Sequence, residues 1–133
     1  MTVRPSDDVA LAESLLRLGG IRHLPVVEGG RLEGLLTQRD LLRALASDRP
    51  GARQQPVAGI MIRDVTTVPP EAGLAHAAKL MLERKFGCLP VCDAAGALLG
   101  IVTESDFVRF AADVVHDLDL VSQAVRGDEG TPA

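Results

Sequence analysis

Apolar residues recur along this chain with two different spacings, and the same succession of spacings occurs twice. From Val9 to Leu18 the apolar positions have the three-to-four-residue spacing of a helix, which Gly19-Gly20 ends. Two short apolar runs follow, at 24–27 and 32–37, and the glycine turn between them predicts a β-hairpin. Helical spacing returns from Gln38. The first 50 residues are therefore predicted to form a helix, a hairpin and a second helix.

An internal repeat explains why the pattern returns. Shifted by 65 residues, segment 2–27 aligns without a gap with segment 67–92, and nine of the 26 paired positions are identical. Chance matching at this composition would give about one or two identities. One residue is then inserted near 94–97, and the alignment continues at a shift of 66. The second copy therefore predicts the same elements, as a helix at 71–84, strands at 89–92 and 98–103, and a helix at 104–115.

The repeat also predicts how the chain is organised. A copy of about 45 residues is too short to bury its own apolar face well, so we expect the copies to pack together with pseudo-twofold symmetry. The predicted fold class is α/β in the broad sense (α+β), with a small β-sheet and two helices in each copy. We expect the chain to divide into a first repeat (1–50), a connecting segment (51–64), a second repeat (65–117) and a helical extension with a frayed tail (118–133).

Composition and charge narrow the function classes. The 133 residues carry a net charge of −4 and contain no Trp or Tyr, which disfavours a general nucleic-acid binder and aromatic stacking platforms. No apolar run approaches the roughly 18 residues that a membrane span needs. Cys88 and Cys92, if they lie on one strand, are about 13 Å apart and cannot form a disulfide. No Cys/His spacing resembles a zinc site. We therefore expect a reduced, cytoplasmic protein without a metal site.

Each copy also carries the same short motif. A Leu-Pro-Val strand, at 24–26 and 89–91, precedes a Gly-apolar-apolar-Thr-x-x-Asp segment, at 34–40 and 100–106. In these residues the chain resembles the cystathionine-beta-synthase (CBS) domain, and the two copies resemble a tandem CBS pair, or Bateman module. In that family an extended segment precedes the first helix of each copy. Residues 60–68 provide it for the second copy, and the first has only Met1-Thr2-Val3, so its first strand is expected to be truncated.

The resemblance implies a regulatory function rather than an enzyme. It implies an adenosine-containing ligand (AMP, ADP, ATP or S-adenosylmethionine) bound in clefts between the repeats, with no required cofactor. It also implies a flat homodimer that controls a partner enzyme, channel or transporter. The alternative is a structural dimerisation module without a nucleotide ligand. Enzymatic activity has little support, because the sequence contains no nucleophile elbow, metal-ligand cluster or P-loop.

The residues predicted to bind the ligand begin with the two Thr-x-x-Asp motifs, Thr37 with Asp40 and Thr103 with Asp106. Each Thr ends a strand where a helix begins, so a phosphate fits at the first N–H groups, with the hydroxyl as a further donor. An ionised Asp only accepts hydrogen bonds, which suits the hydroxyls of a ribose. The same spacing is also that of a capping box, in which both side chains serve the backbone. Both interpretations stay open.

Other candidates follow from the chemistry of an adenine nucleotide. Without Trp or Tyr, an adenine ring would be enclosed by aliphatic side chains and proline, for which the candidates are Ile21, Pro25, Ile62, Val65, Pro90 and Val102. Backbone groups of Val65, Thr66 and Thr67 would supply its specificity. Arg22 and His23 would meet the phosphate, and Arg39 and Arg63 could add charge. Gly87 and Cys88, which match Arg22 and His23 in the second copy, are neutral, so the two clefts are predicted to differ.

Overall fold

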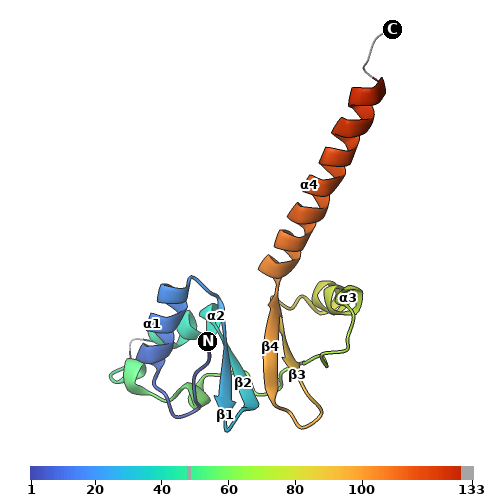
Figure 1. Ribbon diagram of the computed structural model, residues 1–133. Coiled ribbons are helices and arrows are strands. Elements are labelled where there is room, and N and C mark those ends of the chain that lie inside the picture. The colour runs from blue at the N-terminus through green and yellow to red at the C-terminus, as the bar shows by residue number, and fades with distance from the viewer. Residues whose placement is uncertain (48, 130–133) are drawn as a thin grey trace.

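Both copies of the repeat fold into the elements that the pattern predicts. The computed structural model describes residues 1–47 and 49–129 (Figure 1); Asp48 and the last four residues of the expected tail lie outside them. The first repeat contains α1 (Val9–Gly19), β1 (His23–Glu28), β2 (Arg31–Thr37) and α2 (Gln38–Ala46). The second contains α3 (Leu74–Arg84), β3 (Cys88–Cys92), β4 (Leu98–Thr103) and α4 (Glu104–Glu129). Two single 3-10 turns, Ala52–Gln54 and Val57–Gly59, lie between the repeats.

The helix boundaries differ from the predicted ones for local reasons. Asp8 caps α1 by accepting the Leu11 N–H at 2.8 Å. The third helix begins three residues later than expected, after Gly73, whereas α4 continues well beyond residue 115. It includes residues 118–129, so the expected extension is helical.

The two hairpins have the same register, which makes the pseudo-symmetry explicit. Each is an antiparallel two-stranded sheet, so the α+β fold class is confirmed. His23 pairs with Thr37 as Cys88 pairs with Thr103. The register shifts at matching positions, between Val26 and Val27 in the first hairpin and between Val91 and Cys92 in the second. Val3 forms a parallel bridge to Val26, as Val68 does to Val91. Residues 1–3 therefore occupy the place of a first strand with a single bridge.

The core of the first repeat is the larger of the two. Its buried residues come from α1, both strands, α2 and the connecting segment, and they are Val3, Val9, Ala12, Leu16, Leu24, Val26, Leu36, Leu41 and Val57. The corresponding cluster in the second repeat has four buried members, Val68, Ala77, Met81 and Leu89. Since the two sequences are alike, the difference comes from what covers each hairpin.

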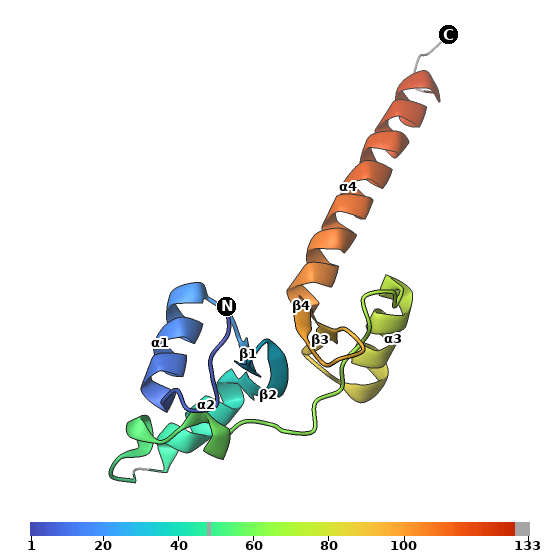
Figure 2. The same ribbon diagram turned by 60° about the horizontal axis from the view of Figure 1, so that its bottom comes forward.

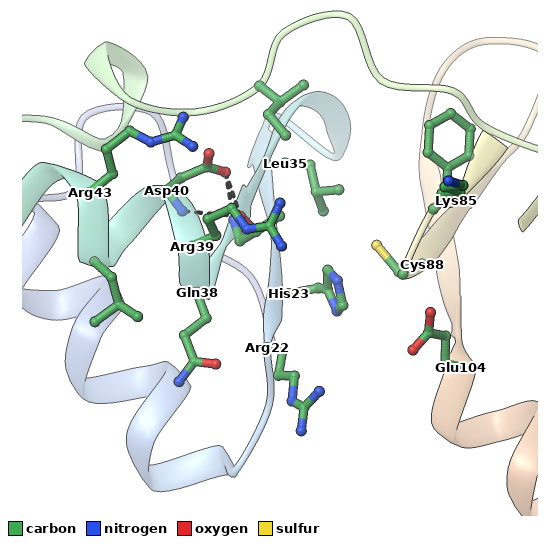
Figure 3. A pocket seen from close by; sticks show the side chains of 15 residues that line it. Arg22, His23, Leu35, Gln38, Arg39, Asp40, Arg43, Lys85, Cys88 and Glu104 are labelled. Atoms are coloured by element: carbon green, nitrogen blue, oxygen red, sulfur yellow. Dashed lines mark hydrogen bonds between the residues drawn. The ribbon is translucent and has the colours of Figure 1, made fainter.

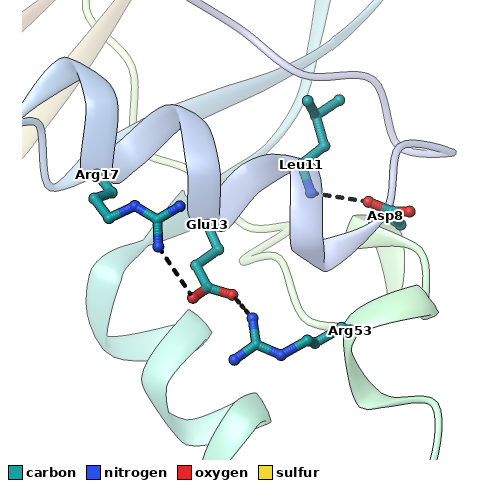
Figure 4. A network of polar contacts seen from close by, with 5 residues as sticks. All are labelled: Asp8, Leu11, Glu13, Arg17 and Arg53. Carbon is teal, nitrogen blue, oxygen red and sulfur yellow. Dashed lines mark hydrogen bonds and ion pairs between the residues drawn. The ribbon is translucent and has the colours of Figure 1, made fainter.

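The connecting segment covers the first repeat. Val57 is fully buried, and its N–H donates to the Asp7 carbonyl at 2.8 Å. Glu13 on α1 accepts a hydrogen bond from Arg53 and lies 3.9 Å from Arg17 (Figure 4). Further on, Ile62 and Leu35 exchange main-chain hydrogen bonds of 2.8 and 2.9 Å. Only after this does the chain pass to the second repeat (Figure 2), so the segment adds a layer to the first repeat.

The repeats meet at the tips of their hairpins. The Leu32 N–H donates to the Gly96 carbonyl, and the Leu98 N–H donates to the Gly30 carbonyl, at 3.1 and 3.0 Å. At the other ends of the hairpins, where α2 and α4 begin, the side chain of His23 reaches the backbone of Gly87. From there α4 projects away from both repeats (Figures 1 and 2). In the described part of the chain, none of the helices combines the length and apolar character that crossing a bilayer requires.

Candidate functional site

The two Thr-x-x-Asp motifs form closely similar strand-to-helix corners. At the first, Asp40 Oδ2 accepts the Thr37 N–H at 3.1 Å and the Thr37 hydroxyl at 2.7 Å, and the Asp40 N–H donates back to Thr37 Oγ1 at 3.2 Å. This is a complete capping box. At the second, Asp106 Oδ2 accepts the N–H and the hydroxyl of Thr103, at 2.8 and 3.2 Å. Both motifs therefore act as helix caps.

The caps leave few donors for a phosphate at the helix ends, contrary to our expectation from the sequence. The Thr37 hydroxyl and N–H both point to Asp40, and the Gln38 N–H donates to the Arg22 carbonyl at 2.9 Å. The Glu104 N–H is engaged in the same way by the Gly87 carbonyl. Oδ1 of Asp40, by contrast, has no hydrogen bond from the described residues. The corner therefore offers an acceptor suited to sugar hydroxyls. Because its backbone donors are already engaged, an anion bound there would need cationic side chains as partners.

A cleft of about 880 Å³ opens beside the first corner, between the two repeats. Figure 3 shows Arg39, Asp40 and Arg43 on the wall of the first repeat, and Lys85, Cys88 and Glu104 on the opposing wall. Leu35 and Ile62 form an apolar part of the lining. This volume is in the range of small-molecule sites.

The cleft brings together four of the residues predicted to bind a ligand, Arg22, His23, Thr37 and Asp40. The others lie outside its lining. Pro90 is fully buried in the second hairpin, and Val102 packs against the core of the second repeat. Val65, Thr66 and Thr67 belong to the extended segment before α3, and Thr103 and Asp106 form the second corner. Of the further candidates, Arg39 and Ile62 line the cleft.

Positive charge is concentrated in this cleft, although the chain is acidic overall. Arg22, Arg39, Arg43 and Lys85 line it, against Asp40 and Glu104. Sequence reasoning missed Arg43, Lys85 and Glu104. Arg43 lies one turn after Arg39 on α2, a spacing that places both on the same side of a helix. Lys85 and Glu104 flank the second hairpin, and only the packing of the repeats brings them to the first corner.

His23 stands where the two repeats come closest in the cleft. A Cβ atom on Gly87 would lie 2.7 Å from His23 Nε2, so only glycine allows this approach. Desolvation lowers the pKa of His23; the Glu104 carboxylate acts in the opposite direction, and Arg22 adds to the lowering. Burial raises the pKa of the neighbouring Cys88 to about 12. Cys88 is therefore a neutral thiol in this wall, and neither it nor Cys92 forms a disulfide.

Lys85 has a strained backbone. It ends α3 with φ 57° and ψ 39°, a left-handed conformation that the matching residue of the first repeat, Gly20, adopts with φ 59°. For a residue with a Cβ this conformation costs roughly 1 kcal/mol. Because the Lys85 side chain lines the cleft, we interpret the strain as the cost of placing an ammonium group there.

Replacing Lys85 with glycine is expected to separate these two effects. Lys85→Gly should raise the free energy of unfolding by about 1 kcal/mol, since the strain is removed, and should weaken the binding of phosphate-bearing ligands. Urea unfolding and calorimetry measure the two quantities. Lys85→Gln, which keeps the Cβ and removes the charge, should weaken binding without the gain in stability. A less stable glycine variant would contradict the argument.

Comparison with known proteins agrees with the duplicated fold. The family model of the CBS domain matches residues 1–47 and 57–113. The chain is 40% identical over 106 residues to inosine-5'-monophosphate dehydrogenase of Korarchaeum cryptofilum; the match covers 80% of this chain and 21% of that enzyme. The chain thus spans about a fifth of the length of this relative.

Solved structures show the same architecture. The structure of CBSX2 in complex with AMP has a TM-score of 0.76 and 33% sequence identity, covering 86% of this chain and 88% of that one. The CBS domain pair of protein MJ0100, in complex with 5'-methylthioadenosine and S-adenosyl-L-methionine, has a TM-score of 0.73 and 28% identity, covering 85% and 90%. With both repeats matched, the chain belongs to the CBS domain family and is a tandem CBS pair.

Proposed function

We propose that this CBS pair is a regulatory module that binds an adenosine-containing ligand in the cleft beside Thr37 and Asp40. The observation that carries the proposal is that four cationic side chains, Arg22, Arg39, Arg43 and Lys85, line the cleft against only two carboxylates, in a chain of net charge −4. A cleft of this kind suits a ligand that has both hydroxyl groups and an anionic group. Nucleotides combine the two.

The lining suggests an orientation for the ligand. Asp40 Oδ1 accepts hydrogen bonds from the ribose hydroxyls, while Oδ2 continues to cap α2. Leu35 and Ile62 provide an apolar surface for the base. The phosphate lies toward Arg22 and Lys85, on opposite walls, where charge-assisted hydrogen bonds are stronger than neutral ones. A ligand in this place contacts both repeats and therefore favours one relative arrangement of them.

Regulation of a partner follows from this position between the repeats. We propose that the module has no catalytic activity of its own, forms a homodimer and controls an enzyme or transporter through its ligand-dependent shape. The relatives support this, because the chain matches a segment of a metabolic enzyme, and two neighbours have adenosyl compounds bound. The proposed ligand is AMP, ADP, ATP or S-adenosylmethionine.

The second candidate function is structural. Thr37 and Asp40 already form a complete capping box, so they do not need a ligand to explain their presence. In that case the module would only mediate association. The cations in the cleft distinguish the two functions, because helix capping alone gives no reason to gather them.

Calorimetric titration of the full chain tests the proposal. AMP, ATP and S-adenosylmethionine are compared with adenosine, which lacks the phosphate. We expect at least one charged ligand to bind with micromolar-to-millimolar affinity and more tightly than adenosine. Equal affinities for AMP and adenosine would contradict the role of the cations. If none of the compounds bound, the ligand-binding function would be excluded and the structural function would remain.

The lowered pKa of His23 predicts opposite pH effects on stability and on binding. Because the folded-state pKa is below the unfolded value of 6.5, the unfolded chain binds more protons in this interval, and stability falls as the pH falls through it. A phosphate beside His23 favours the imidazolium, so AMP affinity should rise over the same pH decrease. The phosphate of AMP itself titrates near pH 6, which changes the affinity for every protein variant. AMP affinity and the free energy of unfolding are therefore measured at about pH 6 and 8 for both the native protein and His23→Gln. A pH dependence that is identical in both proteins would contradict this role of His23.

A further inference from the structure

Glu104 places a negative charge in the cleft that the fold itself does not require. It begins α4 and lines the wall of the second repeat, opposite Arg22 and His23 (Figure 3). Its N–H donates to the Gly87 carbonyl at 3.2 Å, just as the N–H of the matching residue Gln38 donates to the Arg22 carbonyl at 2.9 Å. The same corner therefore forms with a neutral amide in the first repeat, so the charge of Glu104 has another role.

The two carboxylates of the cleft are held differently. Asp40 accepts the N–H and the hydroxyl of Thr37, which fix its position at the corner. The Glu104 side chain has no ion pair within residues 1–47 and 49–129. Desolvation lowers the pKa of His23, and the Glu104 carboxylate opposes this lowering, so its charge acts across the cleft on the opposite wall. Glu104 thus contributes a negative potential close to the place proposed for the phosphate.

The charges of the cleft suit a ligand with a single phosphate group. Four cationic side chains face two carboxylates in the lining, which leaves an excess of two positive charges when His23 is neutral. One phosphate group carries about −1.5 to −2 charges at pH 7, which balances this excess. A diphosphate or triphosphate carries more negative charge, and the lining holds no further cation for it. S-Adenosylmethionine brings a sulfonium and an ammonium group into a cleft that is already positive.

We propose that the cleft selects nucleoside monophosphates and that Glu104 is the residue that disfavours longer phosphate chains. This inference rests on the proposed function and narrows the ligand class of the same site. Figure 3 places Asp40 and Glu104 on opposite walls. With the ribose at Asp40 and the first phosphate between Arg22 and Lys85, further phosphates extend toward Glu104 and meet a like charge. Selectivity of this kind comes from a repulsive group placed against the competing ligand.

Calorimetric titration of the full chain with AMP, ADP and ATP, without divalent cations, tests the selection. We expect the affinity to decrease in that order, with ATP about tenfold weaker than AMP. In Glu104→Gln the ATP affinity should rise by about tenfold and the AMP affinity by at most about threefold, so the preference should largely disappear. Because glutamine occupies the matching position 38, the variant should fold normally, which thermal unfolding checks.

Glu33→Gln is the matched control. Glu33 is exposed on β2 and lies outside the cleft lining, and its replacement changes the net charge of the chain by the same amount. The ratio of the AMP and ATP affinities should therefore stay at its native value. An equal change of this ratio in both variants, or no change in Glu104→Gln, would overturn the role of Glu104.

The native chain separates this inference from the proposed function. If AMP binds and ATP binds as tightly or more tightly, selection of monophosphates is overturned, whereas the module still binds an adenosine-containing ligand. If none of the three nucleotides binds, both the selection and nucleotide binding in the cleft are overturned.

Discussion

Asp40→Asn is expected to weaken AMP binding by about 10- to 100-fold while leaving the fold intact, as judged by calorimetry and by thermal unfolding. The asparagine carbonyl can still accept the Thr37 N–H, so most of the capping box survives. The amide group that replaces Oδ1 donates hydrogen bonds and cannot accept those of the ribose hydroxyls. The charge that strengthens these bonds is also lost.

Asp106→Asn is the matched control. Oδ2 of Asp106 accepts the N–H and the hydroxyl of Thr103, as Oδ2 of Asp40 does from Thr37, but Asp106 does not line the cleft between the repeats. Its replacement should change stability by a similar small amount and leave AMP affinity within about twofold of the native value. If Asp106→Asn lost as much affinity as Asp40→Asn, the ligand would bind at the second corner or at both.

Gly34→Ala is expected to destabilise the protein by about 1–3 kcal/mol, measured by urea unfolding. Its Cβ would lie 2.8 Å from the main-chain oxygen of Ile62, which cannot move aside as a flexible side chain can. The substitution should therefore separate Ile62 from Leu35. Because these two residues line the cleft, AMP affinity should fall as well.

Gly100→Ala serves as the comparison, because Gly100 is the matching glycine of the second repeat. With no atom near the new Cβ and no left-handed backbone at this position, alanine should be neutral or stabilising by up to about 1 kcal/mol, since it restricts the unfolded chain. Equal losses of stability for Gly34→Ala and Gly100→Ala would show that contact with the connecting segment is not what distinguishes these two positions.

Much of the fold could be predicted because its determinants are local and occur twice. Helical spacing, glycine turns and the Leu-Pro-Val strands placed both hairpins, and the repeat transferred each assignment from one copy to the other. The capping interpretation of Thr37 and Asp40 also followed from spacing alone. Helix ends were less predictable: α3 begins only after Gly73, and α4 continues without a break from Glu104 through the expected extension to Glu129.

The asymmetry of the pair could not be predicted, because it depends on the path of the connecting segment. Periodicity does not show that Ile62 pairs with Leu35, and therefore does not show which edge is covered. In the same way, Lys85 and Glu104 belong to the second repeat in sequence but line the cleft of the first corner. These two residues reach the first corner only because the two copies pack together, and the sequence pattern does not show how they pack.

The main-chain bonds between the hairpin tips have a mechanical consequence. They fix the repeats to one another at Leu32–Gly96 and Gly30–Leu98, whereas the cleft at the other ends of the hairpins has no main-chain hydrogen bond between the repeats among the described residues, so a small rotation about the tips would change its width. The 26 residues of α4 begin at the opposite end and extend for about 39 Å. A rotation of about 5° would displace the far end of such a lever arm by roughly 3 Å. A small rotation of the repeats on ligand binding would thus become a larger displacement at the far end of α4.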